Sequence, residues 1–259
     1  MNKTRILITG GAGYIGSLLT PRLLSQNYEV TVIDNFMYNQ NSLNNLCSNK
    51  NFHIINADIR DKNILRESSA NKDIIIPLAA YVGAPLCNKD PFGAKEVNLN
   101  AQLELLKSIS KNQIVVMPMT NSGYGIGEKD SYCDENTPLR PISLYGKHKV
   151  EVEEVLLERE NSVSLRLATV FGMSPRMRLD LLVNDFVNRA YNDKAIIIFE
   201  GGFRRNFVHI RDVVEAFNFS IDNFEKMKGE PYNIGLSNAN LTKIDLCKKI
   251  KEHIKDFFY

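Results

Sequence analysis

The stretch YGKHK, residues 145–149, places a tyrosine and a lysine four positions apart. Four residues make about one helical turn, so on a helix Tyr145 and Lys149 lie on one face. A phenol, with an ordinary pKa of about 10, is a poor base at neutral pH, and a neighbouring ammonium favours its ionised form. The pair could therefore accept a proton from an alcohol. The alternative is chance spacing on an exposed helix, and in either case Lys147 and His148 are expected at the surface.

A glycine-rich stretch, ITGGAGYIG, directly follows the first apolar run of the chain. Its residues Gly10, Gly13 and Gly16 have the spacing GxxGxxG and would lie between a strand and a helix. In that setting Gly10 permits a tight turn, Gly13 lets the backbone approach a pyrophosphate, and Gly16 allows close helix–sheet packing. The N-terminus of the helix also attracts anions. The stretch therefore predicts a dinucleotide site, with a simple turn as the alternative.

Two aspartates follow the next two apolar runs. Asp34 lies 18 residues after Gly16, where a carboxylate can accept hydrogen bonds from an adenosine ribose diol and would repel a 2′-phosphate. We therefore predict NAD rather than NADP, although a strand-ending aspartate can also cap a turn. Asp58, in NADIRD, could contact the adenine amine or serve only its own turn, and the sequence leaves both roles open.

The elements that must position these residues follow from the apolar pattern. Five short apolar runs indicate buried strands, and three intervening stretches have the apolar period of a helix. The strands are expected at 5–10, 29–34, 52–55, 73–80 and 113–119, and the helices at 14–26, 61–70 and 91–110. Continuous apolar strands that alternate with helices predict a parallel sheet covered on both faces, which is a doubly wound α/β (Rossmann) fold.

The pattern changes after about residue 170. The later elements are expected as a helix at 176–194, two short strands around a glycine turn at 195–210, and further helices at 211–224 and 242–259. We interpret residues 1–170 as an NAD-binding domain, to which some later segments return. Residues 171–259 are interpreted as a smaller, partly discontinuous substrate-binding lobe.

The composition argues against several classes of protein. The net charge is only +2, from 32 basic and 30 acidic residues, so there is no general attraction to nucleic acid or to an anionic membrane. The apolar runs are too short for a secretion signal or a membrane span. The four cysteines are scattered, without the spacing of metal ligands, so neither a metal site nor a disulfide framework is expected. These features predict a cytoplasmic protein.

Further motifs occur in a fixed order along the chain: PLAA, TNSGYG, SLYGKHK, RLATVFG, RRNFVHIRDV and YNIG. Together with GGAGYIG and Asp34 they resemble the extended short-chain dehydrogenase/reductase family over essentially the whole chain. Members of that family are mostly nucleotide-sugar epimerases, dehydratases and dehydrogenases. The resemblance implies NAD as cofactor, a nucleotide-diphosphate sugar as substrate, and hydride exchange at one carbon, most often C4. It also implies a homodimer formed through the helices near 91–110 and 143–160.

The resemblance also implies roles for individual residues. Tyr145 and Lys149 match the catalytic pair, Thr120 matches the residue that hydrogen-bonds the reacting hydroxyl, and Asn98 matches an asparagine that supports the active-site helix. The implied cofactor contacts are Gly10, Gly13, Tyr14, Ile15, Gly16, Asp34, Asn35, Asp58, Ile59, Leu78, Ala79, Ala80, Asn98, Tyr145 and Lys149. The implied substrate contacts are Val82, Ser122, Tyr124, Arg176, Asn184 and Arg205.

Several positions depart from the family pattern and narrow the reaction. Dehydratases of the family carry Asp and Glu directly after the catalytic threonine, whereas this chain has Asn121 and Ser122, so dehydration is not expected. Epimerisation and net dehydrogenation both fit. Leu78 replaces a usual histidine and Thr169 a usual asparagine. These changes keep open an alternative of another class, a non-catalytic or regulatory dinucleotide-binding protein on the same scaffold.

The combination AAYVGAPLC, TNSGYGIGEKD and SPRMRLDLLVNDF resembles a bacterial branch that includes GDP-heptose 4-dehydrogenases of capsule synthesis. GDP-heptose is therefore one expected substrate. Relatives continue past the helix at 242–259, so we expect a substrate lobe that is truncated at its C-terminus. One wall of the site would then be reduced or supplied by a partner chain, and a truncated gene is the plain alternative.

Overall fold

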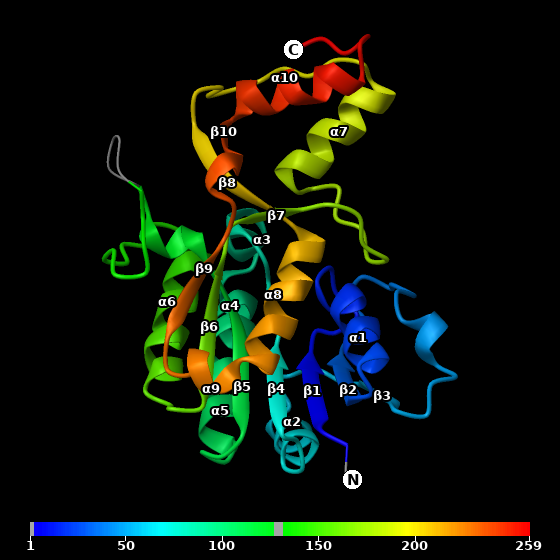
Figure 1. Ribbon diagram of the computed structural model, residues 1–259, viewed down its shortest axis with the longest axis vertical. Coiled ribbons are helices and arrows are strands. Elements are labelled where there is room, and N and C mark those ends of the chain that lie inside the picture. The colour runs from blue at the N-terminus through cyan, green and yellow to red at the C-terminus, as the bar shows by residue number, and fades with distance from the viewer. Residues whose placement is uncertain (1–2, 127–131) are drawn as a thin grey trace.

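The computed structural model describes residues 3–126 and 132–259, so the end of the TNSGYGIGEKD motif lies outside the described residues (Figure 1). Its main feature is a seven-stranded parallel sheet with the order β3-β2-β1-β4-β5-β6-β9. The strands are β1 (Arg5–Thr9), β2 (Glu29–Asp34), β3 (Phe52–Asn56), β4 (Ile74–Pro77), β5 (Ile114–Thr120), β6 (Ser162–Leu167) and β9 (Pro231–Ile234). The order 3-2-1-4-5-6 is that of a Rossmann sheet.

Alternate residues of the central strands pack on opposite faces of this sheet. On β1, Ile6 and Ile8 belong to one apolar cluster and Leu7 belongs to the other. One cluster is covered by α1 (Gly16–Ser25), α8 (Ile210–Asp222) and α9 (Phe224–Met227). The other is covered by α2 (Lys62–Ser69), α5 (Ala101–Ser108) and α6 (Leu144–Leu157). Apolar side chains on both faces of each strand require two helical layers, and the predicted doubly wound α/β fold is confirmed.

The helix expected at 91–110 is interrupted. After α3 (Ala84–Lys89), the chain forms α4 (Pro91–Lys95), then a π-helical turn over Glu96–Asn100, and then α5. Such turns often occur at functional sites. This one contains Asn98, whose side chain is buried and bonded to the loop that follows β4.

A second sheet of three strands lies beyond the carboxyl ends of the main sheet (Figure 1). Its strands are β7 (Thr169–Phe171), β8 (Arg204–His209) and β10 (Asn240–Thr242), in the order β10-β8-β7. Together with α7 (Leu182–Asn192) and α10 (Lys243–His253), they enclose a third apolar cluster. Between β8 and β10 the chain returns to the main sheet to form α8, α9 and β9.

The segment that leads into α7 differs from the sequence prediction. A helix was expected from residue 176, but α7 begins at Leu182. Residues 172–181 instead run against the glycine-rich stretch, where Ser174 Oγ donates a hydrogen bond of 2.7 Å to the carbonyl oxygen of Tyr14. This tertiary contact holds the segment against the first helix of the sheet domain as a series of bends and a turn.

The last two expected elements are also corrected. Of the two strands predicted within 195–210, only β8 forms, and Ala195 makes an isolated bridge with Phe258. The terminal helix ends at His253, because the chain then turns back and buries Phe257 in the third apolar cluster. Across the two described ranges, no helix is both long and apolar enough to cross a membrane. The same residues contain no group of three His, Cys, Asp or Glu side chains placed to hold a metal ion.

Candidate active site

A cavity of about 840 Å³ lies at the carboxyl ends of β1, β2, β4, β5 and β6, which is where open parallel sheets bind ligands. Most residues expected at the cofactor or substrate form its wall. They are Gly10, Gly13, Tyr14, Ile15, Gly16, Asp34, Asn35, Asp58, Ile59, Leu78, Ala79, Ala80, Val82, Thr120, Ser122, Tyr145, Lys149, Arg176 and Arg205. Residues separated by almost 200 positions in the sequence therefore meet in one place.

Asn98 and Asn184 were expected to contact ligands, but both lie outside the wall of this cavity. The side chain of Asn98 accepts a hydrogen bond from the backbone N–H of Tyr81 at 2.7 Å and donates one to its carbonyl oxygen at 2.8 Å. Asn184 accepts from the N–H of Gly172 at 2.9 Å and donates to the Tyr14 hydroxyl at 3.2 Å. Each amide thus supports a loop of the cavity instead of facing a ligand.

Tyr124 is the third residue whose predicted position is corrected. It is buried, and its hydroxyl donates a hydrogen bond of 2.7 Å to Asn233 Oδ1 and accepts one of 2.9 Å from Arg166 Nη1. The guanidinium turns this side chain away from the cavity. In this structure Tyr124 therefore faces Arg166 and Asn233 and is not part of the cavity wall.

The glycine-rich turn fits closely against its neighbours. Gly10 has φ of +69°, in the left-handed region, and a Cβ there would lie 2.6 Å from Cα of Ala79. A Cβ on Gly16 would lie 2.5 Å from Cα of Gly11. Among the described residues, no side chain caps the start of α1 at Ile15. The N–H groups of Ser17 and Leu18 donate to the carbonyl oxygens of Gly13 and Ile15 at 3.0 and 3.1 Å, so the N–H of Gly16 is the one at the start of the helix that can bind an anion.

Asp34 lies in the wall beside this turn. Its carboxylate accepts hydrogen bonds from the backbone N–H groups of Ala12 at 3.0 Å and Phe36 at 2.8 Å. Burial raises the pKa of Asp34, while these two bonds and the positive charge of Arg176 oppose that increase. The Arg176 guanidinium in turn stacks 4.1 Å from the ring centroid of Tyr38, another wall residue. The sequence analysis did not identify Tyr38.

Asp58 is held as an anion on the same side of the cavity. Two hydrogen bonds from the Arg60 guanidinium, at 2.8 and 2.9 Å, lower the pKa of Asp58 to about 2 against the opposing effect of burial. Asn35 Nδ2 donates a further bond of 3.0 Å. The carboxylate therefore organises its own loop, which is one of the two roles left open by the sequence.

The loop Leu78–Ala80 passes next to the glycine-rich turn. The N–H of Leu78 donates to the carbonyl oxygen of Thr9 at 2.9 Å, and Gln102 Nε2 donates to the carbonyl oxygen of Ala79 at 2.9 Å. These bonds join the loop to β1 on one side and to α5 on the other. The backbone of the cavity floor is therefore fixed at both edges.

Thr120 ends β5 at the middle of the cavity. Its Oγ1 accepts a hydrogen bond of 3.1 Å from the N–H of Ser122, which caps the short 3₁₀ turn Asn121–Tyr124. The bond fixes the orientation of the hydroxyl and leaves its proton free for another acceptor. Asn121 and Ser122 also line the cavity, beside Thr120.

Tyr145 and Lys149 enter the cavity from the first turns of α6. The helix starts at a Ser143 cap, whose Oγ accepts from the N–H of Gly146 at 3.1 Å. Lys149 Nζ donates a hydrogen bond of 3.0 Å to the carbonyl oxygen of Pro118 on β5. Burial lowers the pKa of Lys149 to about 8, and Glu153 partly opposes this shift. The two side chains share the helix face that their spacing predicted.

The electrostatics of Tyr145 differ from the sequence prediction. Lys149 was expected to lower the pKa of the phenol, but burial raises that pKa to about 12, and Cys87 adds to the increase. The charge that lowers it belongs to Arg178. Arg178 lines the cavity and donates from Nε to Asp180 at 3.1 Å. The sequence analysis missed Arg178, and the only signal was its place two residues after Arg176.

His148 is also corrected, because it was expected at the surface. It is 6% exposed, and burial lowers its pKa. Within the described part of the chain, its Nδ1 has no hydrogen-bond partner. Lys147 is exposed, as expected. The side chain of His148 is therefore covered by protein, whereas Lys147, beside it on α6, faces solvent.

Three comparisons with known proteins agree with this geometry. The sequence profile of the NAD dependent epimerase/dehydratase family matches residues 6–235. A protein from Methanocaldococcus jannaschii with the provisional name UDP-glucose 4-epimerase is 31% identical over 243 residues, which cover 89% of this chain and 76% of that protein.

Two solved structures extend the comparison. UDP-glucuronic acid 4-epimerase from Bacillus cereus, in complex with UDP-glucuronic acid and NAD, superposes with a TM-score of 0.85 at 27% identity and covers 96% of this chain and 82% of its own. A dTDP-glucose 4,6-dehydratase from Bacillus anthracis in complex with NAD also gives 0.85, at 22% identity, with 99% and 84% covered. At that identity the second match concerns the fold alone.

Proposed function

Because this chain belongs to the NAD-dependent epimerase/dehydratase family, we propose that it oxidises C4 of a nucleotide-diphosphate sugar. The observation that carries the proposal is the convergence of Thr120, Tyr145 and Lys149 in one cavity with the glycine-rich turn. A binding module would need the turn, but it would not need a hydroxyl, a phenol and an ammonium beside it.

The cavity wall fits NAD, the cofactor of the family. Gly10 and Gly16 leave room where any side chain would collide with backbone, and the Gly16 N–H at the start of α1 would face the pyrophosphate. The carboxylate of Asp34 is available to a ribose diol and disfavours a 2′-phosphate. When bound, NAD⁺ supplies a hydride acceptor and a positive charge close to the phenol.

The residues of the chain would act on the substrate hydroxyl. Thr120 would orient it, and Tyr145, as the phenolate, would take its proton while the C4–H bond breaks and C4–O becomes a carbonyl. Lys149 holds its position through the carbonyl oxygen of Pro118, where its charge can contact the nicotinamide ribose. Because burial raises the pKa of Tyr145, the nearby charge of Arg178 contributes to forming the phenolate.

The reaction that follows oxidation is either epimerisation or release of the ketone. In the first, hydride returns to the opposite face of C4, and in the second, a 4-dehydrogenase releases a keto sugar and reduced cofactor. Asn121 and Ser122 cannot replace the carboxyl groups that a dehydration needs, so elimination of water is not part of the proposal.

Incubation with sugar nucleotides, followed by measurement of absorbance at 340 nm and NMR of the product, distinguishes epimerisation from release of the ketone. An isomeric alcohol identifies an epimerase and stoichiometric ketone a dehydrogenase, whereas no turnover with retained NAD binding would favour a regulatory binding protein.

For the substrate, we propose GDP-heptose in bacterial surface-polysaccharide synthesis, in the cytoplasm. The support is the run of residues 174–186, SPRMRLDLLVNDF, from which Arg176, Arg178 and Asp180 line the cavity. The similar proteins described above carry the names of UDP-sugar and dTDP-sugar enzymes. A direct comparison of kcat/KM for GDP-heptose, UDP-glucose and UDP-glucuronic acid tests the choice. A preference for either UDP-sugar would contradict it.

We also propose a homodimer through the helices at 91–110 and 143–160. Phe92, on α4, is 75% exposed and would be covered in such an interface. Sedimentation of the protein and of a Phe92→Glu variant tests this. We expect a dimer for the unmodified chain and a monomer for the variant, and a monomeric unmodified chain would exclude the dimer.

A further inference from the structure

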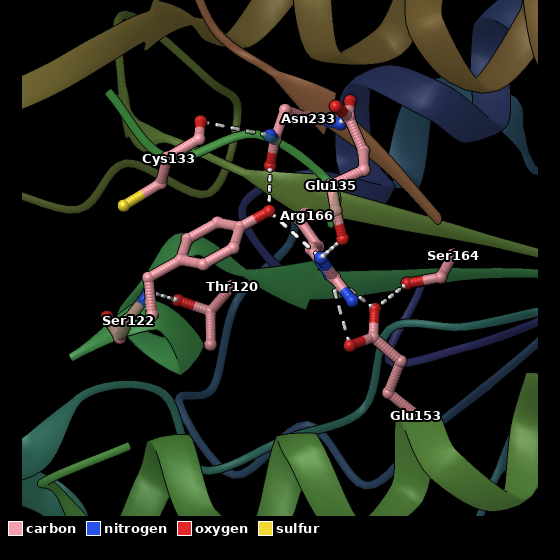
Figure 2. A network of polar contacts seen from close by, with 9 residues as sticks. Thr120, Ser122, Cys133, Glu135, Glu153, Ser164, Arg166 and Asn233 are labelled. Carbon is pink, nitrogen blue, oxygen red and sulfur yellow. Dashed lines mark hydrogen bonds and ion pairs between the residues drawn. The ribbon is translucent and has the colours of Figure 1, made fainter. Parts of the chain in front are cut away.

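A buried ion pair lies between the catalytic helix and the main sheet (Figure 2). The side chains of Arg166, on β6, and Glu153, on α6, are only 6% and 4% exposed. Arg166 Nε donates to the two carboxylate oxygens of Glu153 at 3.0 and 3.1 Å, and Ser164 Oγ donates to the same carboxylate. The proposed chemistry uses none of these three side chains.

The other end of the guanidinium reaches the turn that follows β5. Arg166 Nη1 donates to the Tyr124 hydroxyl at 2.9 Å and to the carbonyl oxygen of Glu135 at 3.0 Å. The Tyr124 hydroxyl donates a hydrogen bond of 2.7 Å to Asn233 Oδ1 on β9. We call this set, Arg166, Glu153, Ser164, Tyr124, Glu135 and Asn233, the Arg166 network. One side chain thus connects α6, β6, β9 and the turn Asn121–Tyr124.

Two of the connected elements carry catalytic groups. On α6, Tyr145, Lys149 and Glu153 follow one another at intervals of four residues and therefore lie along one stripe. Lys149 attaches this stripe to β5 through Pro118, and Glu153 attaches it to β6 through Arg166. Tyr145 is at the end of the stripe, so its position follows from these two attachments.

The turn after Thr120 is the second connected element. In the register of the sheet, Met119 pairs with Arg166 and Thr120 with Leu167, so the arginine lies beside the residue that precedes the threonine. Tyr124, which ends the turn, is held by the same guanidinium. The network therefore spans the two elements that present the Thr120 hydroxyl and the Tyr145 phenol.

A role in stability alone does not account for this arrangement. Removing two charges from water costs free energy that their attraction only partly restores, and apolar residues of similar volume often replace a buried ion pair without loss. Catalysis is more demanding, because a misplacement of about 1 Å can reduce a rate on the order of a hundredfold. A planar guanidinium with fixed donor directions is suited to define geometry.

We propose that Arg166 is a positioning residue that sets the Thr120 hydroxyl against the Tyr145 phenol through Tyr124 and Glu153. The proposal rests on the proposed function, in which these two groups act on one substrate hydroxyl. We expect the loss of Arg166 to change kcat more than substrate binding, because none of the described residues of the Arg166 network lines the cavity wall.

The principal test compares Arg166→Lys, Arg166→Met and the double variant Glu153→Leu/Arg166→Met. The double variant removes both charges, so we expect a Tm close to that of the unmodified protein, unchanged NAD affinity, and kcat reduced at least tenfold with KM for the sugar nucleotide within threefold. Arg166→Lys keeps the positive charge but lacks the planar guanidinium with its fixed donor directions. We therefore expect its Tm to be higher than that of Arg166→Met, whereas its kcat should remain as low. Unmodified kcat in the double variant, or full recovery by lysine, would overturn the proposal.

Two further measurements keep the test decisive if the double variant does not fold or no sugar nucleotide is turned over. Tyr124→Phe removes one hydroxyl and should lower kcat at least threefold at nearly constant Tm. Hydrogen exchange does not depend on turnover, and we expect faster exchange of the amides of Ser122 and Gly125 in both Arg166→Lys and Tyr124→Phe. Unchanged exchange in these variants would refute the positioning role, whereas an absence of turnover with faster exchange would refute only the proposed function.

Discussion

One stripe of α6 enters two polar regions, the cavity through Tyr145 and Lys149 and the Arg166 network through Glu153. In the network, the guanidinium of Arg166 faces the carboxylate of Glu153, and it also donates to the Tyr124 hydroxyl and to the carbonyl oxygen of Glu135. In the cavity, the buried ammonium of Lys149 donates to a carbonyl oxygen, and the half-buried phenol of Tyr145 lies in the wall. A buried charge thus faces an opposite charge in the network, whereas the ammonium of Lys149 faces a neutral carbonyl group.

The difference appears in the pKa values. Burial lowers the pKa of Lys149 to about 8 and raises that of Tyr145 to about 12. For Arg166, the bonds to Glu153 and Tyr124 outweigh burial and raise the pKa, so its charge is permanent. An ion pair of opposite charges fixes the positions of its two side chains. A titratable group without such a partner has a pKa that the charge of a bound ligand can change, as active sites require.

The largest expected effect is on turnover when the cavity loses its phenol. Tyr145→Phe should reduce kcat by roughly a thousandfold, because a positioned proton acceptor contributes on the order of 10²–10⁴. The free energy of unfolding should change by less than about 1 kcal/mol, since only a hydroxyl is removed. Steady-state kinetics and urea unfolding measure the two quantities. Tyr28→Phe, at a partly buried tyrosine outside the cavity wall, is the matched control, and a kcat within tenfold of the original would remove Tyr145 from the mechanism.

Replacing Arg166 or Arg178 by methionine should lower the free energy of unfolding by different amounts in the two regions. Arg166→Met leaves Glu153 buried without its counter-charge and should cost about 3–5 kcal/mol of unfolding free energy. Arg178→Met should cost less than about 1 kcal/mol, because its partner Asp180 is 64% exposed and water screens the pair. Urea unfolding of both variants provides the comparison. Equal losses would mean that the charges of the cavity are structural as well.

The pH dependence of stability should reveal Lys149. Its pKa in the folded protein, about 8, is below the ordinary 10.5, so between these pH values the unfolded chain binds more protons. The free energy of unfolding contributed by this group therefore rises with pH across that interval, by on the order of 3 kcal/mol in total. Lys149→Met should lack this rise. Urea unfolding of both proteins at pH 8 and pH 10 isolates the term, and parallel pH dependences would show that Lys149 titrates normally.

The smallest expected effect is a displacement of the pH–rate profile. Arg178→Gln removes the charge that lowers the pKa of Tyr145, so the rise of kcat/KM with pH should move to higher pH. Below that rise, the rate at a fixed pH would fall. Arg204→Gln, at an exposed arginine of β8 outside the cavity wall, is the control. A lower rate with an unmoved profile would assign Arg178 to substrate binding alone.

The sequence allowed much of the sheet domain to be predicted, for local reasons. Its strands carry apolar residues on both faces, and the glycine-rich turn and Asp34 lie next to such strands, so their positions follow from the strand order. Tyr124 could not be placed in this way. A tyrosine beside an active site can face substrate or protein, and the Arg166 that turns it away is 42 residues further along the chain.

The segment 172–181 presented the same difficulty. Its composition suggested a helix, but it contacts Tyr14 and Ser17 through bends and a turn, and Arg178 lies near the phenol. Asn184, expected at the substrate, instead supports this segment through its bond to the carbonyl oxygen of Arg178, at 2.9 Å. Each of these contacts joins residues that only the complete fold brings together.

The sequence by itself determined which groups are available and how neighbours along the chain are spaced. Tyr145 and Lys149 share a helix face because of their four-residue interval, and Gly10 can adopt its positive φ because it has no side chain. Only the tertiary structure decided which of these groups are protonated at a given pH. The burial of a residue depends on every element that covers it. The complete fold covers His148, and burial within it raises the pKa of Tyr145 and lowers that of Lys149. The fold also places Arg178 as the cation that acts on the phenol.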